Sequence, residues 1–272
     1  MNKTMTRVPV TLLAVILLAS LVSCSPFQLG LLGNAWLGHE THDVTGRMGL
    51  LIKQKIRFAE YETMVVKRSW TRGSNGYSGL GFGTFGTGQY VNLIGREYID
   101  RKQTIRFDLS DGGNRGSTVF AVSQFQASNL LLGNNRGLLS IGIDLLEYKS
   151  GNFSNLFFAQ IYNPDSEEPW QLVLNNDRAQ RFPKECAGTI AKSSGEYYTI
   201  FPVSTLQNSE GKIMSMPFGS IGFEIRNSSG RPLAAVNISE RGQVHFARNL
   251  DPEVRFLMAN ISTALLLQEV IG

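Results

Sequence analysis

Two histidines and two acids stand close together in the segment His39-Glu40-Thr41-His42-Asp43. Imidazole and carboxylate groups are ordinary zinc ligands, so this segment is the first candidate for a metal site. Its H-x-x-H spacing differs from the i, i+4 pair of a helical zinc protease, and a clear third ligand is missing. His245, the third histidine of the chain, falls in a predicted strand. The pattern favours a polar segment, and we predict no metal ligand.

Gly81-Phe82-Gly83-Thr84-Phe85-Gly86 matches the G-x-G-x-x-G pattern of dinucleotide-binding sites. Such a site needs a strand before the glycines, a helix after them and an acidic residue about 20 residues further on. Residues 73–79 before the motif are loop-like, and Thr87-Gly88-Gln89-Tyr90 after it is a poor helix. The motif therefore indicates a glycine-rich loop with aromatic side chains, and we predict no cofactor.

No local pattern indicates a catalytic nucleophile. The sequence has no serine in a G-x-S-x-G elbow, and Cys186 lies in a predicted loop without a histidine nearby. Glu167-Glu168 beside Trp170 could act on a glycosidic bond, but that chemistry needs two carboxyl groups that face each other across a cleft. We predict no catalytic residue; a site assembled from residues distant in sequence is the alternative.

Basic and aromatic residues mix in Lys67-Arg68-Ser69-Trp70-Thr71-Arg72, as they do in single-strand nucleic-acid sites. The net charge of +4 includes Lys3 and Arg7 of the N-terminal segment, so the rest of the chain carries only about +2. A balance that small is not the footprint of a nucleic-acid partner. We predict no nucleic-acid binding and interpret the basic run as a strand edge or a surface that meets anionic lipid headgroups.

The N-terminus has the layout of a secretory signal peptide. Lys3 and Arg7 form a charged region, the run from Val8 to Ala19 is mostly apolar, and small residues follow it. The apolar run up to Val22 is shorter than the about 20 residues of a transmembrane helix. We therefore predict a cleaved signal, with an uncleaved N-terminal anchor as the alternative.

Leu21-Val22-Ser23-Cys24 resembles the lipobox of bacterial lipoproteins, whose signal is cut before the cysteine. The resemblance implies that Cys24 becomes the first mature residue and carries the lipid, with palmitate among its acyl chains. Two or more acyl chains attach a protein stably to a membrane. Ser25 stands where an aspartate signals inner-membrane retention in many Gram-negative bacteria. The resemblance therefore implies a location at the outer membrane.

Length and composition predict a folded unit after the signal. Of the 272 residues, 42% are hydrophobic and 18% are charged, which is enough to bury a core. With Cys24 acylated, Cys186 has no partner, so the fold depends on its core rather than on disulfides. We predict a signal at 1–24, a tether at 25–47 that packs in part on the domain or the bilayer, and a β-rich domain at 48–272.

From Gly49 onwards, short runs of β-branched and aromatic residues alternate with turn signals such as Asp111-Gly112-Gly113 and Ser228-Ser229-Gly230. The predicted strands are 50–52, 55–58, 61–70, 90–94, 104–109, 118–125, 138–148, 156–162, 171–175, 188–191, 197–202, 221–226, 232–238 and 243–246, with a loop at 178–187. Many short strands at close spacing favour an antiparallel barrel or sandwich.

The pattern changes at the end of the chain. Asp251-Pro252-Glu253 has the residues of a helix start: an N-cap acid, proline at the first helical position and an acid in the first turn. The helix that follows is apolar around most of its circumference, with polar residues only at Arg255, Asn260, Ser262, Thr263, Gln268 and Glu269. A helix of this kind is buried, so we predict a core helix at 251–271.

Gly222-Phe223-Glu224-Ile225-Arg226, the segment Gly230 to Val236 and the segment Leu250 to Leu267 read as a strand, a turn with a second strand, and a hydrophobic helix. This order is similar to the end of the tubby-like fold, which tubby, phospholipid scramblases and LURP-one-related proteins share. The resemblance implies a barrel of about twelve strands around the terminal helix. It implies no ligand.

Together these patterns favour a non-enzymatic, lipid-anchored protein of the cell envelope, whose β-rich domain binds a partner or supports the envelope. Its expected partner is the membrane, through the lipid on Cys24; the sequence identifies no protein partner. Two alternatives stay open. One is a carrier whose barrel holds a lipid or a small apolar ligand, and the other is an envelope hydrolase with a spatially assembled site. An interior already filled by the terminal helix would argue against the carrier.

Overall fold

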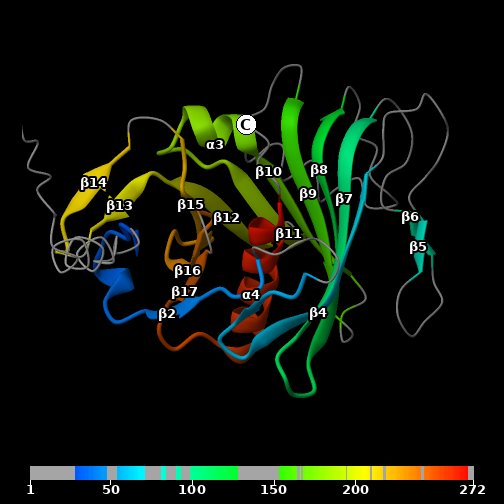
Figure 1. Ribbon diagram of the computed structural model, residues 1–272, viewed down its shortest axis with the longest axis horizontal. Coiled ribbons are helices and arrows are strands. Elements are labelled where there is room, and N and C mark those ends of the chain that lie inside the picture. The colour runs from blue at the N-terminus through cyan, green and yellow to red at the C-terminus, as the bar shows by residue number, and fades with distance from the viewer. Residues whose placement is uncertain are drawn as a thin grey trace, which may run out of the picture.

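An antiparallel sheet of twelve strands forms the body of the protein (Figure 1). The structure is a computed structural model that describes residues 28–47, 54–70, 81–83, 90–92, 99–127, 153–163, 166, 168–193, 195–208, 210–216, 219–239 and 242–268. The strands follow one another across the sheet in the order β2 (Glu40–Asp43), β17 (Gln243–Phe246), β16 (Pro232–Asn237), β15 (Gly222–Asn227), β12 (Glu196–Val203), β11 (Gly188–Ser193), β10 (Trp170–Asn175), β9 (Phe153–Tyr162), β8 (Gly116–Ala127), β7 (Ile99–Ser110), β4 (Tyr61–Trp70) and β3 (Arg57–Phe58).

The two ends of this sheet meet, so that it closes almost into a barrel. Beyond β2, Thr45 pairs with Arg57 of β3 in an isolated antiparallel bridge. The Thr45 N–H donates to the Arg57 carbonyl at 2.9 Å, and the Arg57 N–H donates to the Thr45 carbonyl at 3.1 Å. This pair joins the first and last strands of the twelve-strand order, so the sheet is nearly closed.

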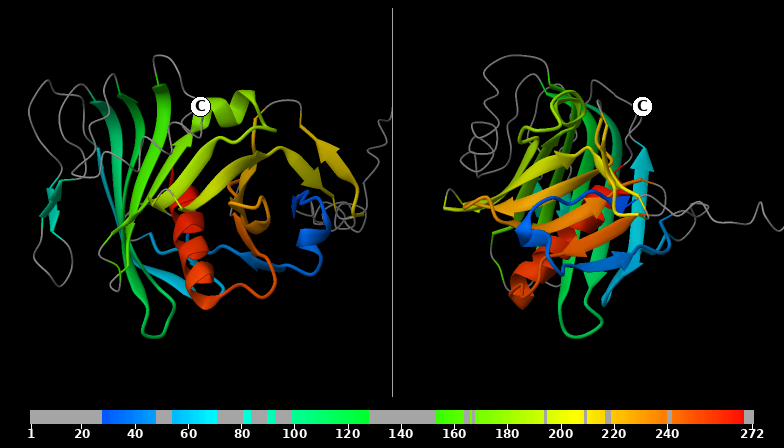
Figure 2. Two further views of the ribbon diagram at one scale, coloured as in Figure 1. Left: turned by 180° about the vertical axis from the view of Figure 1, so that it is seen from behind. Right: turned by 90° about the vertical axis from the view of Figure 1, so that its left-hand side faces the viewer.

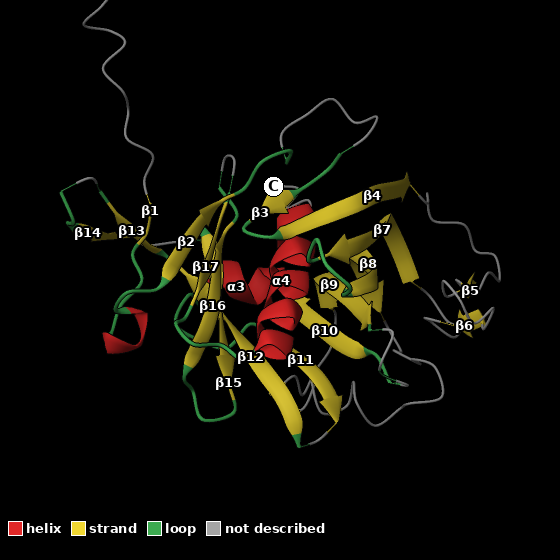
Figure 3. Cartoon of the chain, turned by 90° about the horizontal axis from the view of Figure 1, so that it is seen from below, coloured by secondary structure: helices red, strands yellow, loops and turns green. Residues whose placement is uncertain are grey.

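The helix α4 (Pro252–Leu267) lies inside the ring of strands, as the view from below shows (Figure 3). Every residue from Phe256 to Gln268 is buried. The strands alternate in the usual way, and their inward side chains pack on the helix. Large members of this core are Ile56, Phe107, Leu109, Phe157, Ile161, Leu172, Phe223 and Phe246. The helix therefore occupies the interior of the sheet.

The sequence explains both the start of α4 and its polar side chains. The Asp251 carboxylate accepts a hydrogen bond from the Glu253 N–H at 2.9 Å, which satisfies one of the free donors of the first turn. Within the core, Asn260 accepts from the Ser117 hydroxyl of β8 at 2.5 Å and donates to the Phe256 carbonyl at 3.0 Å. The Thr263 hydroxyl donates to the Ala259 carbonyl at 2.8 Å. Asn260 and Thr263 are thus paired, as burial requires, whereas the buried Ser262 hydroxyl has no hydrogen-bond partner among the described residues.

Smaller elements extend the molecule beyond the main sheet. A three-stranded sheet contains β1 (Gln28–Leu29), β13 (Thr205–Gln207) and β14 (Ile213–Ser215), and it lies with the 3-10 helix η1 (Asn34–Trp36) at one end of the molecule (Figures 1 and 2). A separate hairpin joins β5 (Gly81–Gly83) to β6 (Tyr90–Asn92), and α3 (Asn176–Arg181) follows β10.

The predicted fold class is confirmed: the chain is mainly β, with a barrel-like antiparallel sheet and a buried C-terminal helix. The strand predicted at 61–70 has the same bounds as β4, while those at 50–52 and 138–148 lie outside the described residues. The described part of the expected tether, 28–47, is built into the fold, because β2 belongs to the main sheet and Trp36 is buried. The predicted loop from residue 178 is wrong at its start, since α3 extends to Arg181.

Candidate functional site

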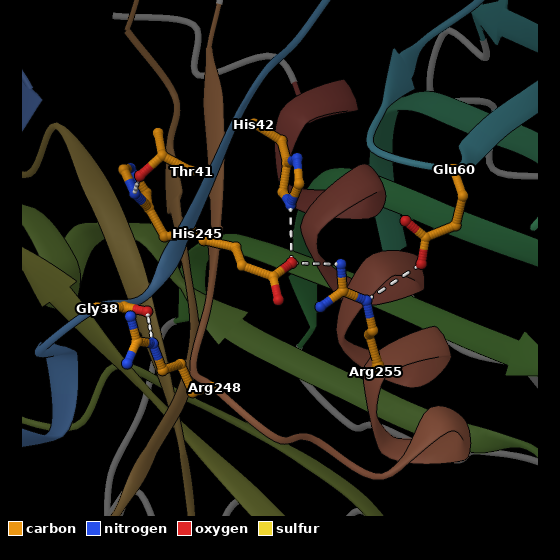
Figure 4. Close-up of polar contacts among 8 residues, drawn as sticks. Gly38, Thr41, His42, Glu60, His245, Arg248 and Arg255 are labelled. Carbon is orange, nitrogen blue, oxygen red and sulfur yellow. Dashed lines mark hydrogen bonds and ion pairs between the residues drawn. The ribbon is translucent and has the colours of Figure 1, made fainter.

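Charged side chains gather where the sheet closes. We name Glu40, His42, Glu60 and Arg255 the closure cluster (Figure 4). The guanidinium of Arg255, in the first turn of α4, donates to the Glu40 carboxylate at 2.8 Å and to the Glu60 carboxylate at 3.1 Å. Glu40 belongs to β2 and Glu60 to the turn between β3 and β4, so the arginine links the two end regions of the sheet.

The remaining contacts of the closure cluster hold the arginine in place. Arg255 lies over the ring of Phe246 at 4.5 Å from its centroid, a cation–π contact that covers its flat face. His42 Nε2 lies 3.3 Å from the same Glu40 oxygen that Arg255 contacts. The side chain of Arg255 is only 18% exposed, whereas those of Glu40 and Glu60 are each 47% exposed. The cluster therefore opens to solvent on its acidic side.

The electrostatics of the closure cluster keep both carboxylates ionised at neutral pH. The hydrogen bond from Arg255 is the main reason that the pKa of Glu40 lies below its ordinary value. Burial alone would raise the pKa of Glu60, but its backbone hydrogen bond and Arg255 outweigh burial and lower it. Burial likewise opposes the charge of Arg255, and the two glutamates overcome that effect and raise its pKa. Neither carboxyl group is suited to act as a general acid at neutral pH.

A second polar group lies on the outer face of the sheet. The register places Thr41 of β2, His245 of β17, Ala235 of β16 and Glu224 of β15 side by side. Thr41 Oγ1 and His245 Nδ1 share a hydrogen bond of 3.0 Å (Figure 4). Trp36 of η1 covers this row, because it is buried beside Ala235 and its Nε1–H donates to Glu224 at 2.8 Å.

His39 brings a further imidazole to this row. Its Nδ1–H donates to the Trp36 carbonyl at 2.7 Å, and its ring centroid lies 5.3 Å from that of His245. Burial lowers the pKa of His245 to about 3, and the nearby His39 and His42 act in the same direction against the weaker opposite effect of Asp43. His245 is therefore neutral at pH 7.

These residues do not form a recognisable metal site. Across the described ranges, no group of three or more histidine, cysteine, aspartate or glutamate side chains is placed to hold a metal ion. The side chains of this segment form hydrogen bonds and ion pairs instead. His39 contacts the Trp36 carbonyl, Glu40 accepts from Arg255, and Asp43 accepts from Gln243. His245, which the sequence placed in a separate strand, is brought beside His39 by the pairing of β17 with β2.

Two arginines meet the other end of α4. Arg47 Nε donates to the Leu266 carbonyl at 3.0 Å, and Arg68 Nη2 donates to the Leu267 carbonyl at 3.0 Å. Cations are favourable at this helix end, where the carbonyls carry partial negative charge. Arg68 was expected at a strand edge or a lipid-facing surface, but the structure directs it to the helix and leaves Lys67 of the same run exposed.

The other motifs do not assemble with these clusters. Cys186 is a half-buried free cysteine, and burial raises the pKa of its thiol. Its Sγ lies 3.2 Å from the Gly188 carbonyl oxygen. Trp170 packs against Tyr198 with ring centroids 5.4 Å apart, and Glu168 is exposed. Of the glycine motif, Gly81–Gly83 forms β5, and its remaining residues lie outside the described part of the chain.

The predicted lipidation site, Cys24, also lies outside the described residues, which begin at Gln28. Within the described ranges, the helices are all too short or too polar to cross a membrane.

Sequence reasoning missed Arg255, Glu40 and Glu60 as a group, although an arginine in the first turn of an apolar helix is a signal for nearby acids.

Comparisons with known proteins add no family assignment to these observations. No protein-family model, no curated protein and no solved structure gives a significant match to this chain.

Proposed function

We propose that this protein is a non-enzymatic lipoprotein of the cell envelope, held at the outer membrane by acyl chains on Cys24. The observation that carries the proposal is the order of the N-terminal features: Lys3 and Arg7, the apolar run from Val8, and Leu21-Val22-Ser23-Cys24. The β-rich domain then binds a partner or supports the envelope. A fold with a large core of its own, independent of the N-terminal segment, is compatible with this role.

The filled interior favours this proposal over a carrier of apolar ligands. Thirteen consecutive residues, Phe256 to Gln268, are buried inside the sheet. A carrier such as a lipocalin keeps the space inside its barrel for the guest. Here α4 takes that space, and the hydrogen bonds of Ser117, Arg47 and Arg68 hold the helix to the surrounding chain.

The closure cluster favours a structural role over hydrolysis. Paired carboxyl groups of a glycosidase need one member with a raised pKa, so that it can donate a proton. In the closure cluster, Arg255 contacts both Glu40 and Glu60, and the pKa values of both are lowered. The described carboxylates at this position therefore serve to neutralise the arginine.

We also propose that the domain is a member of the tubby-like group of folds. The twelve-strand sheet and the terminal helix inside it have the arrangement that the resemblance implies. The segments that suggested it form β15, β16 and α4, and β15 pairs with β16 in a hairpin. This proposal concerns the fold and carries no ligand with it.

Metabolic labelling with a radioactive or clickable fatty acid in the native host tests the lipid anchor. We expect the wild-type protein to incorporate the label and to fractionate with membranes. Cys24→Ala should lose both properties, because the lipobox then lacks the thiol that accepts the lipid. Cys186→Ala is the matched control and should keep the label. Equal labelling of wild type and Cys24→Ala would refute the proposal.

A further inference from the structure

Exposed apolar side chains concentrate at one end of the molecule. In the described part of the chain, the large hydrophobic residues with high exposure are Leu32, Leu37, Met64, Phe182, Ile213 and Met214. Four of these six belong to the end built from β1, η1, β13 and β14 and the residues next to them. We name Leu32, Leu37, Ile213 and Met214 the apolar end. Several exposed large apolar side chains at one end of a molecule are a candidate interaction surface.

The local structure explains why these side chains are left uncovered. The order β1-β13-β14 makes β14 an outer strand, and Ile213, Met214 and Ser215 are all exposed. Leu29 and Trp36 of the neighbouring segment face the other way and are buried against Ala235 and Val203. The segment from Gln28 to Leu37 therefore places one set of apolar residues on the sheet and another set, Leu32 and Leu37, toward solvent.

The short distance along the chain between Cys24 and β1 limits how far this surface can lie from a lipid on Cys24. Cys24 precedes Gln28 by four residues, which span at most about 14 Å when fully extended. A domain of this length has a radius of gyration of about 18 Å, so an acyl anchor at Cys24 holds the β1 end at the bilayer and keeps the opposite end away from it. Figures 1 and 2 place β1, η1, β13 and β14 together, away from β7 and β8.

We infer that the apolar end rests on the bilayer, with the side chains of Leu32, Leu37, Ile213 and Met214 in its interfacial layer. This inference rests on the proposed lipid anchor and adds to it a fixed orientation of the domain. Apolar side chains that enter the headgroup and acyl boundary gain by leaving water. The acyl chains and the apolar end then form two contacts with one membrane, and the first contact raises the effective concentration of the membrane for the second.

Depth-dependent fluorescence quenching tests this orientation. The acylated protein, in a Cys186→Ser background, carries an environment-sensitive dye on Leu32→Cys and is reconstituted in phosphatidylcholine vesicles with or without brominated acyl chains. The matched control carries the dye on Met64→Cys, because Met64 of β4 has the same exposure, 62% against 61% for Leu32, but is remote from β1. We expect brominated lipid to quench the dye at residue 32 strongly, since the interface extends only about 5–10 Å, and to leave residue 64 little affected.

The possible results separate the two proposals. Equal quenching at residues 32 and 64, in protein whose acyl mass is verified by mass spectrometry, overturns the orientation and leaves the lipid anchor intact. A purified product without acyl mass overturns the anchor, and the orientation with it. A dye at residue 32 that is shielded from water but not quenched, in protein of doubled native mass, assigns the surface to a second copy of the chain and also overturns the inference.

Discussion

Arg255 occupies a position that is unfavourable for a cation by itself. The N-terminus of a helix carries partial positive charge, and most of α4 is apolar. Glu40 and Glu60 compensate, and they come from opposite ends of the twelve-strand order. The two glutamates thus neutralise the arginine, and the three residues together connect the regions that must meet for the sheet to close.

Replacement of Arg255 should therefore weaken the fold measurably. We expect Arg255→Met to lower the free energy of unfolding by about 1–2 kcal/mol, an estimate reduced because both glutamates are half-exposed. Urea unfolding at pH 7, followed by circular dichroism, measures the change. Arg231→Met, at an exposed position in the β15–β16 turn, is the control and should stay within about 0.5 kcal/mol of wild type. Equal effects of the two substitutions would contradict the bridging role.

His245 should make the stability of the protein depend on pH in a defined window. Its pKa is about 3 in the folded protein and about 6.5 ordinarily, so the unfolded chain binds the proton more readily. The contribution of the neutral His245 to the free energy of unfolding is complete above pH 6.5 and is lost as the pH falls toward 3. Between pH 8 and pH 5 we expect a loss of about 2 kcal/mol, measured by urea unfolding at each pH.

Substitution identifies the residue responsible for this pH dependence. His245→Gln should flatten the profile between pH 5 and 6.5, whereas His42→Gln should keep it because His245 is still present. The lowered pKa values of Glu40 and Glu60 affect stability in a different window, below about pH 4.5, where these carboxylates take up protons. An unchanged slope in His245→Gln would show that another group is titrating.

At the scale of single elements, the sequence predicts those helices and strands that have a clear local pattern of residue types. β4 has the predicted bounds, because a run of β-branched and aromatic residues is a strong local signal. The start of the helix predicted at 251–271 was also found, because an N-cap with proline marks it, but α4 ends earlier than predicted, at Leu267. β13 and β14 were missed since three residues are too few to show a period. β2 was missed because Glu40–Asp43 is polar throughout. For α3 a signal existed: the Asn175 side chain caps the helix by accepting from the Arg178 N–H at 2.9 Å.

The candidate clusters could not be predicted in the same way, because their members lie far apart in the chain. Thr41 and His245 are 204 positions apart, and Arg255 is 215 positions from Glu40. Only the pairing of β17 with β2 and the insertion of α4 bring these residues together. The sequence offers their residue types but no spacing that relates them, so their arrangement follows from topology.

At the scale of the whole molecule, closure of the sheet depends on a short segment. Gly46 follows the Thr45 bridge with φ of +77°, a conformation that side chains rarely adopt. A Cβ atom built there would lie 1.7 Å from the Lys55 carbonyl oxygen. The two chain segments approach so closely at this point that only glycine allows them to pair.

This close approach gives a test of closure with a matched control. Gly46→Ala should lower the free energy of unfolding by at least about 3 kcal/mol, because backbone strain adds to a clash that the Lys55 backbone must relieve. Gly230→Ala has a similar φ of +80° but open space around the new methyl group, so it should cost only about 1–2 kcal/mol. Denaturant titration of both variants measures the difference. Similar losses would mean that closure tolerates displacement of the 45–57 pair.

The placement of α4 has a consequence for how the molecule is made. The helix that fills the centre is the last of the described elements to leave the ribosome, so the strands synthesised before it have nothing to wrap around. Native assembly of the core must therefore wait until synthesis has nearly finished. The order of elements along the chain thus delays formation of the core until the C-terminal segment is available.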